Sequence, residues 1–266
     1  MNREERHPLS AAMRERVLEE LQRVEREQQV RVLYACESGS RAWGFASPDS
    51  DYDVRFVYVH QPDWYLRVEE PRDVLERPLT DELDLSGWEL RKALRLLRKS
   101  NPTLLEWLDS PLVYRQDDVA SRRLRELALE FHSPAAVRAH YLAMARNNYR
   151  AFLRGDEVRY KKYFYVLRPL LAVRWIDQGL GVPPMVFEEL LAATLDDPVQ
   201  CAEINELLRL KRQVGEAACG PVRPVLQHLV ETELHRAESM SAPRTHTGDV
   251  SKLDAFLREC VSATAV

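Results

Sequence analysis

Two short motifs in the first part of the chain combine residue types that suit phosphate chemistry. Gly39-Ser40 follows one apolar run, and Asp51-Tyr52-Asp53 opens the next one after ten intervening residues. Side chains alternate along a strand, so Asp51 and Asp53 should point to one face, roughly 6.6 Å apart. Such carboxylates can bind Mg²⁺ together with substrate phosphates, and two ions can hold the attacking and leaving oxygens of an in-line displacement. Gly39 would let the backbone approach a triphosphate and Ser40 would donate a hydroxyl to it. The motifs therefore predict nucleotidyl transfer from an NTP, with two Mg²⁺ ions.

A P-loop and an EF-hand use the same residue types, but the sequence departs from both. Gly39–Gly44 matches the start of a P-loop, whereas Phe45 stands where the Lys should follow. An EF-hand loop beginning at Asp49 would need Gly where the chain has Val54. The remaining alternative for the acidic pair is a solvated turn before an edge strand.

Asp84 is the candidate for a third carboxylate. The stretch Glu82–Trp88 alternates polar and apolar residues, as a half-buried strand does, so Leu83 and Leu85 should face the core and Asp84 the open face. A third acid near the first two could act as the base for an attacking hydroxyl or hold the second ion. Without the upstream pair, Asp84 would be interpreted as an ordinary surface residue of a strand.

Gly39-Ser40, Asp51-x-Asp53 and the strand residue Asp84 resemble the signature of the DNA polymerase beta nucleotidyltransferase superfamily. The whole string 39–55 is similar to a narrower branch, the RNA-repair-pathway polymerase-beta-like predicted nucleotidyltransferases. The similarity runs from about residue 31 to residue 190, and three further segments fit it: Asp84–Leu90, Asn101–Leu108 and Lys161–Leu171.

The resemblance implies a small mixed-sheet catalytic domain, dependence on magnesium, and an RNA end as the acceptor in RNA repair. The choice of NTP, ATP or another, stays open, and so does a protein or small-molecule acceptor. The alternative from a different functional class is a non-catalytic nucleotide- or RNA-binding partner protein that keeps the fold. The presence of all three acids speaks against that alternative.

The hydrophobic pattern divides the chain into a sheet-containing part and a helical part. Strands are predicted at 30–36, 52–60 and 82–87, and helices at 10–26, 88–99 and 103–108, with Asn101 as an N-cap. After Ser110-Pro111 the strand pattern stops, and helices are predicted at 118–131, 133–154, 157–178, 185–194, 198–218, 222–240 and 250–262. Residues 241–248 read as a linker. The predicted fold class is α+β, with a polymerase-beta-like nucleotidyltransferase domain over 1–112 and an all-helical domain over 113–266.

The predicted helix at 157–178 carries a second group of candidate site residues. Lys161, Tyr165 and Arg168 are spaced i, i+4 and i+7 and therefore share one face. The two cations could neutralise a triphosphate, and Tyr165 could stack on a base. Lys162, about 100° further round the helix, could replace Lys161. The alternative is a solvated basic helix face.

Other basic residues lie near the motifs. Arg41 follows the Gly-Ser pair and could reach a γ-phosphate, and Arg55 shares the strand parity of the acidic pair and could orient a carboxylate or a phosphate. Five basic residues on the helix after Asp84 could follow a nucleic-acid backbone, although a solvated outer face is the favoured interpretation. They are Arg91, Lys92, Arg95, Arg98 and Lys99.

Composition narrows the functional class. The 266 residues can bury one good core or two modest ones, no apolar run approaches the length of a membrane span, and the charged start of the chain is no secretory signal. The four cysteines are scattered, so we expect no disulfide framework, no zinc site, a reducing cytoplasm and no membrane partner. The formal charge of −4 argues against bulk attraction to nucleic acid but leaves room for a local basic groove.

Overall fold

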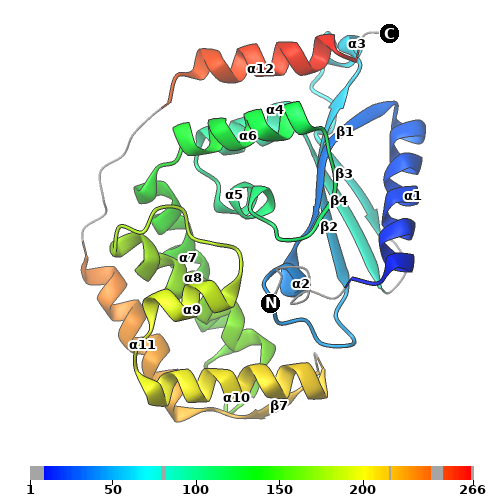
Figure 1. Cartoon of the computed structure of the whole chain (residues 1–266). Coiled ribbons are helices and arrows are strands. Elements are labelled where there is room, and N and C mark those ends of the chain that lie inside the picture. Colours follow the sequence, from blue (N-terminus) through cyan, green and yellow to red (C-terminus); the bar gives the residue numbers. More distant parts are fainter. Residues whose placement is uncertain (1–8, 79–81, 216, 241–247, 265–266) are drawn as a thin grey trace. The chain divides into compact units, whose positions relative to one another are not determined.

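A computed structural model describes residues 9–78, 82–215, 217–240 and 248–264 of the chain (Figure 1). Contacts within the chain divide it into two compact units. The sheet unit comprises Met1–Ala42, Asp51–His132 and His246–Val266, and the helical unit comprises Trp43–Ser50 and Ser133–Thr245.

The sheet unit is built on a five-stranded mixed sheet with the strand order β3-β4-β2-β1-β5. Its strands are β1 (Val30–Glu37), β2 (Tyr52–His60), β3 (Val74–Pro78), β4 (Leu83–Glu89) and β5 (Val113–Gln116). Strands β2 and β4 run parallel, and the other neighbouring pairs run antiparallel. Parallel pairing brings the first residues of β2 and β4 to the same end of the sheet.

Helices cover both faces of this sheet (Figure 1). On one face α1 (Ala11–Gln28) packs its residues Val17 and Leu21 into a buried apolar cluster with Val32, Phe56 and Leu85 of the strands. The other face carries α4 (Leu90–Arg98), α5 (Pro102–Leu108) and α6 (Asp118–Glu130), and α12 (Val250–Ser262) contacts α4 and α6. Two single turns, α2 (Gly39–Ala42) and α3 (Pro62–Tyr65), lie before and after β2.

Polar capping residues determine where several of these helices begin. The side chain of Ser10 accepts a hydrogen bond from the Met13 N–H at the start of α1, and Asn101 accepts one from the Leu104 N–H at the start of α5. The cap at Asn101 confirms the sequence prediction. Asp117 caps α6 in the same way.

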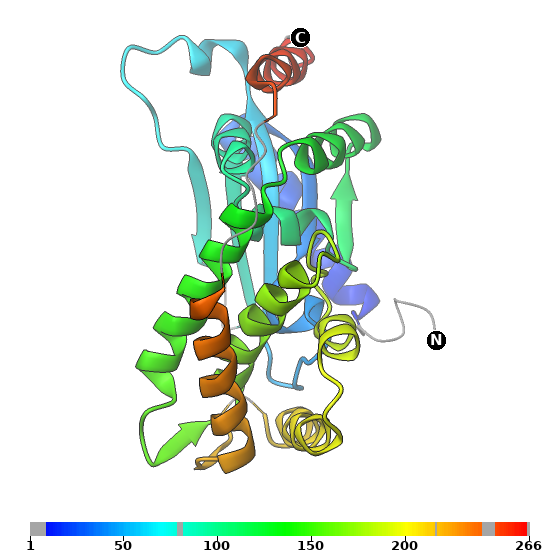
Figure 2. The ribbon, with the colours of Figure 1, turned by 90° about the vertical axis from the view of Figure 1, so that its left-hand side faces the viewer.

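The helical unit contains α7 (Pro134–Phe152), α8 (Lys161–Asp177), α9 (Phe187–Thr194), α10 (Pro198–Val214) and α11 (Pro224–Ser239), with a two-stranded sheet of β6 (Glu157–Arg159) and β7 (Cys219–Pro221). Helix α8 contacts α7, α9 and α11 (Figure 2).

The loop Trp43–Ser50, which separates the Gly-Ser and Asp-x-Asp motifs, belongs to the helical unit. In it, Phe45 stacks on Phe164 at a centroid distance of 4.7 Å and lies edge-on to Phe187 at 5.7 Å.

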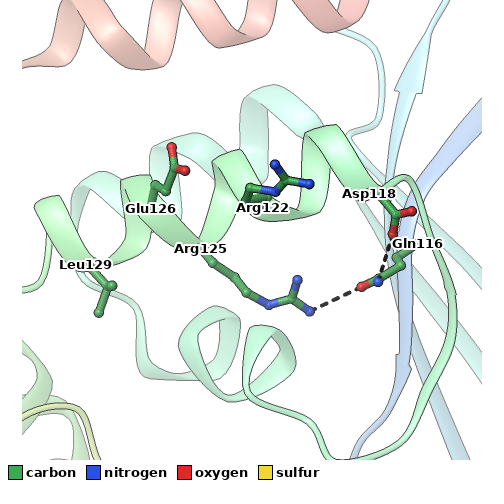
Figure 3. A pocket seen from close by; sticks show the side chains of 6 residues that line it. All are labelled: Gln116, Asp118, Arg122, Arg125, Glu126 and Leu129. Carbon is green, nitrogen blue, oxygen red and sulfur yellow. Dashed lines mark hydrogen bonds between the residues drawn. The ribbon is translucent and has the colours of Figure 1, made fainter.

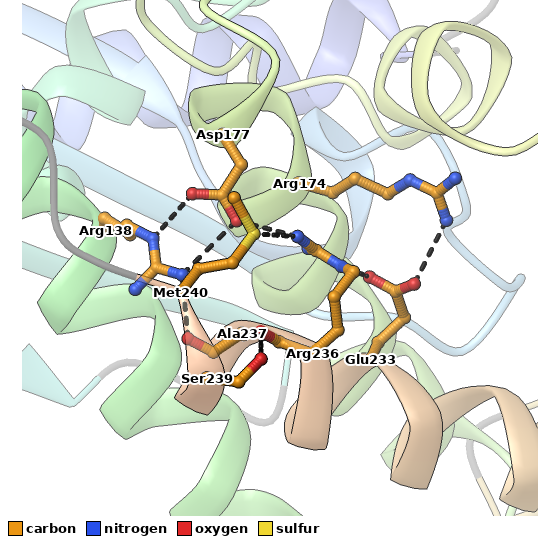
Figure 4. A network of polar contacts seen from close by, with 8 residues as sticks. All are labelled: Arg138, Arg174, Asp177, Glu233, Arg236, Ala237, Ser239 and Met240. Carbon is orange, nitrogen blue, oxygen red and sulfur yellow. Dashed lines mark hydrogen bonds and ion pairs between the residues drawn. The ribbon is translucent and has the colours of Figure 1, made fainter.

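An ion-pair network joins three helices of the helical unit (Figure 4). Asp177 of α8 accepts hydrogen bonds from Arg138 of α7 at 2.6 Å and from Arg236 of α11 at 2.9 Å. Glu233 of α11 accepts from Arg236 at 2.9 Å and from Arg174 of α8 at 3.1 Å. The carboxylates of Asp177 and Glu233 are almost fully buried, and each has two arginine partners that offset the cost of burying its charge.

The α+β fold class is confirmed, and each predicted helix and strand has a counterpart within a few residues. Four strands were missed, and the prediction that strands end at Ser110-Pro111 is wrong because β5 pairs with β1. The missed strands, β3, β5, β6 and β7, have three to five residues each, too few to show a period, and they form only by pairing with a partner. Strand β6 also occupies the start of the helix predicted at 157–178, which begins instead at Lys161.

The packing units differ from the sequence-predicted division at residue 112. Residues 113–132 and 246–266 group with the sheet unit because β5 pairs with β1 and α12 contacts α4. The linker predicted over 241–248 lies outside the described residues except for its last position. Within the described ranges, no helix combines the length and the apolar character that crossing a membrane requires.

Candidate active site

The three predicted acids lie where β2 and β4 begin. Asp51 directly precedes β2, Asp53 is the second residue of β2, and Asp84 is the second residue of β4. In the parallel pairing of these strands Asp53 is the register partner of Asp84. Leu83 and Leu85 are buried while Asp84 is exposed, as the alternating pattern predicts. The fold therefore brings Asp53 and Asp84 to adjacent positions on one sheet face.

A guanidinium group lies between these two carboxylates. Nη2 of Arg55 is 2.8 Å from Oδ1 of Asp53 and 2.8 Å from Oδ2 of Asp84. Nη1 of the same side chain donates to the backbone carbonyls of Val54 at 3.1 Å and Asp84 at 3.2 Å. Arg55 thus balances the charge of both acids and fixes their orientation, which was one of its two predicted roles.

Gly39 lies against the carboxylate of Asp53. A Cβ added at Gly39 would lie 2.0 Å from Oδ2 of Asp53, and Gly39 has a φ of +60°, which L side chains rarely adopt. The next residue, Ser40, is half-buried in the single turn α2. The Ser38 N–H donates to the Asp53 carbonyl at 2.8 Å, which ties the turn to the start of β2. The two motifs are therefore in direct contact.

Arg41 extends along the segment that carries the acidic pair. Its Nε donates to the backbone carbonyl of Asp51 at 3.2 Å, and its guanidinium lies 3.7 Å from the centroid of the Tyr52 ring. Asp51 itself is exposed. Arg41 therefore supports the backbone of the acidic pair in this arrangement, and its predicted contact with a γ-phosphate stays a prediction.

Glu37, which the sequence reasoning missed, lies beneath the site as a fully buried carboxyl group. Its Oε1 accepts a hydrogen bond from the backbone N–H of Asp53 at 2.8 Å, and the Tyr114 hydroxyl donates to its Oε2. Burial raises the pKa of this carboxyl to about 7, although the hydrogen bond from Tyr114 opposes the rise. The available signal was an acid at the end of an apolar strand, two residues before Gly39.

The donor chemistry of the acids suits Mg²⁺, which prefers carboxylate oxygens and water. Among the described residues no group of three or more His, Cys, Asp or Glu side chains is gathered around one point where an ion could bind. Instead, the Arg55 cation lies between Asp53 and Asp84. Asp51 and Asp84 are exposed, so their oxygens are open to an ion and its water ligands.

The predicted residues of α8 lie in the helical unit. Nζ of Lys162 is 4.6 Å from the centroid of the Tyr165 ring, and Tyr165 lies edge-on to Trp43 at 6.1 Å. Arg168 is buried, donates to the Met185 carbonyl at 3.3 Å, and lies 4.8 Å from the Trp43 ring. Lys161, the first residue of α8, is half-buried. Tyr165 and Arg168 therefore share a face, as predicted, and that face contacts Trp43, which the sequence reasoning did not single out.

Three comparisons with known proteins gave matches. A model of the RNA repair pathway DNA polymerase beta family matches residues 13–259. The Bacillus subtilis (strain 168) protein named "Uncharacterized protein YcgL" is 49% identical over 224 residues, which cover 84% of this chain and 86% of that protein. The crystal structure of a nucleotidyltransferase-like protein from Exiguobacterium sibiricum 255-15 aligns with 93% of this chain and 78% of its own, at 16% identity and a TM-score of 0.31. The family match confirms the resemblance found in the motifs.

Proposed function

Because this chain belongs to the RNA repair pathway DNA polymerase beta family, we propose that it transfers a nucleotidyl group from an NTP to an acceptor hydroxyl. The observation that carries the proposal is the contact between Gly39 and Asp53, with Asp84 in register beside Asp53. A phosphate-binding turn and paired carboxylates at one end of a sheet are what this reaction requires.

The described contacts suggest a role for each residue. Asp51 and Asp53 would hold Mg²⁺, which would supply positive charge to the phosphate oxygens. The turn at Gly39-Ser40 would donate N–H and hydroxyl groups to the β- and γ-phosphates. One oxygen of Asp84 is held by Arg55, and the other has no partner among the described residues, so it can accept the proton of the acceptor hydroxyl.

The two substrates and Asp84 account for every bond and proton in this reaction. The acceptor oxygen bonds to the α-phosphorus, the bond from that phosphorus to the bridging oxygen breaks, and pyrophosphate leaves. The hydroxyl proton moves to Asp84. The products are a nucleotidylated acceptor and pyrophosphate.

An RNA end is the acceptor that we propose, because the family description places these proteins in an RNA repair pathway. A protein or small-molecule acceptor would use the same acids. A non-catalytic nucleotide-binding protein would keep the turn at Gly39-Ser40 but would not need Asp84 beside Asp53.

The test is to incubate the protein and its Asp53→Asn variant with each α-phosphate-labelled NTP, Mg²⁺ and total RNA. We expect covalent label on RNA with the wild-type protein and none with the variant. Label on the protein itself would redirect the proposal to a protein acceptor. NTP binding without any labelled product would favour the non-catalytic alternative.

A further inference from the structure

A groove of about 300 Å³ runs along α4 on the sheet unit, between α4 and α12. Arg91, Arg95 and Arg98 of α4 line it, and α12 contributes Leu253, Asp254 and Leu257. We propose that this groove binds the sugar-phosphate backbone of the acceptor strand. The identity of the acceptor as RNA rests on the proposed function, whereas the affinity of the groove for a polynucleotide does not.

The groove along α4 carries an excess of positive charge. Helix α4 carries four basic residues and no acidic one, and the groove combines three arginines with a single acid, Asp254. Arg98 makes no side-chain ion pair or hydrogen bond among the described residues, and the guanidinium of Arg91 lies over the Tyr65 ring at 4.9 Å. Arg95 is paired with Glu70 at 2.9 Å, an exposed pair that a phosphate can replace at little loss. The groove is therefore net cationic, and its arginine side chains can exchange their present contacts for phosphate oxygens.

A second groove on the same unit shows that this charge is particular to α4 (Figure 3). That groove, on α6, is lined by two arginines and two acids, with Gln116 hydrogen-bonded to Asp118 at 3.0 Å and to Arg125 at 3.4 Å. Its two arginines are balanced by its two acids. The α4 groove, in contrast, has three arginines and one acid.

The spacing of the arginines points to a strand and not to a single anion. Arg91, Arg95 and Arg98 extend over about 10 Å of helix at 1.5 Å per residue. A stacked nucleic-acid strand places a phosphate every ~3.4 Å, so about three phosphates cover that length. Guanidinium groups bind phosphate oxygens in bidentate geometry, and the half-buried side chain of Leu257 offers an apolar surface to a sugar or base. A chain of phosphates with apolar groups between them fits this lining better than an acidic peptide does.

The groove also lies at a suitable distance from the acids. Helix α4 begins at Leu90, directly after β4, and Asp84 is at the opposite end of β4. Leu90 is six residues beyond Asp84 in the chain, or about 20 Å of strand. Trp88 has the same strand parity as Asp84, and its ring lies against Trp107 of α5 with the centroids 3.9 Å apart, so Asp84 is on the sheet face that carries α4, α5 and α6. An acceptor whose end lies at Asp84 would need about six nucleotides to reach the groove.

The test measures binding directly on the full chain. The probe is a fluorescent single-stranded RNA of about twelve nucleotides, and its affinity is followed by anisotropy over a series of salt concentrations. The double variant Arg95→Gln/Arg98→Gln should lower the slope of log affinity against log salt by about 1.4, since each lost phosphate contact on a single strand removes about 0.7. The matched control is Arg26→Gln on α1, which covers the other face of the sheet, and its slope should equal that of the wild type.

Three outcomes would contradict polynucleotide binding in the groove. They are no binding of the probe, equal slopes in the double variant and the wild type, and competition by polyglutamate as strong as by RNA. The last of these would assign the surface to acidic proteins. Thermal unfolding of both variants checks that the exposed substitutions leave the fold intact. Transfer assays separate this proposal from the proposed function. A lower slope in the double variant, with no transfer activity in the wild type, would support RNA binding in the groove and reject nucleotidyl transfer. Transfer activity with unchanged slopes would support nucleotidyl transfer and reject RNA binding in the groove. If both hold, the double variant should fail on long acceptors and keep its activity on acceptors shorter than about six nucleotides.

Discussion

Gly39 and Asp53 are in contact although they belong to two different motifs. The space that a side chain on Gly39 would need is filled by the Asp53 carboxylate, and the Ser38 N–H next to Gly39 donates to the Asp53 carbonyl. The position of the Asp53 carboxylate therefore requires a glycine at residue 39. The turn at Gly39-Ser40 and the start of β2 are positioned as one element.

Replacing Gly39 by Ala should abolish transfer. Its Cβ would displace the Asp53 carboxylate, and the positive φ adds a strain of about 1–2 kcal/mol. The matched control is Gly179→Ala, because Gly179 has a φ of +74° with nothing within 4 Å of the added Cβ. Both variants should lose stability in thermal unfolding because of the positive φ, Gly39→Ala at least as much as Gly179→Ala, and only Gly39→Ala should lose activity. Equal activity in the two variants would contradict the contact.

Asp51→Asn and Asp53→Asn should each abolish transfer and weaken Mg²⁺ binding in titration calorimetry. Each substitution removes a negative charge that a hard cation requires and changes little volume. The melting temperature without magnesium should change little for Asp51→Asn, because that side chain is exposed. Near-wild-type activity of either variant in magnesium would reject the metal assignment.

Asp84→Asn should lower the turnover rate by about 10²–10⁴-fold and leave NTP affinity nearly unchanged, because a general base acts in the transition state. Single-turnover rates and equilibrium NTP binding separate the two effects. A collapse of NTP affinity would instead make Asp84 a ligand of the metal–nucleotide complex. Arg55→Gln is the companion variant, since it frees both carboxylates without removing either.

Glu37 should make the stability of the protein depend on pH. Its carboxyl has a pKa of about 7 in the folded chain against an ordinary value of 4.5, so the folded state binds the proton more tightly. Stability from this group is complete below about pH 4.5 and is lost as the pH rises through about 7, by about 3 kcal/mol in total. Glu37→Gln mimics the protonated form, so its unfolding free energy relative to the wild type should rise over this range. Parallel curves from urea unfolding would show that Glu37 does not titrate there.

The two predicted cations of α8 should behave differently. Arg168→Ala should destabilise the protein by about 1–3 kcal/mol, because it leaves the buried Met185 carbonyl without these hydrogen bonds and removes a cation from the Trp43 ring. Lys161→Ala should weaken NTP binding, because it removes a half-buried cation that suits a phosphate. Unchanged NTP affinity in Lys161→Ala would leave the start of α8 without a role in nucleotide binding.

The acids, the glycine and most of the helices could be predicted from the sequence because each has a local signature: parity on a strand, a motif spacing, or a helical period. Arg55 was correctly placed on the acidic face because parity alone decides it. Glu37 was missed because its partners, the Asp53 N–H and the Tyr114 hydroxyl, come from strands far apart in the chain. The edge strand that carries Tyr114 was missed for the same reason: its four residues are ordered by pairing with β1 and not by any local pattern.

Nucleotidyl transfer is tested by following two labels in parallel, one on the α-phosphate and one on the γ-phosphate of the same NTP. With wild-type protein, magnesium and RNA, the α-label should appear on the RNA, and the γ-label should appear only in pyrophosphate, in equal amounts. The Asp53→Asn variant should show neither. Transfer of the γ-label to the RNA, or release of the γ-label as free phosphate with no α-label on any acceptor, would contradict nucleotidyl transfer at this site.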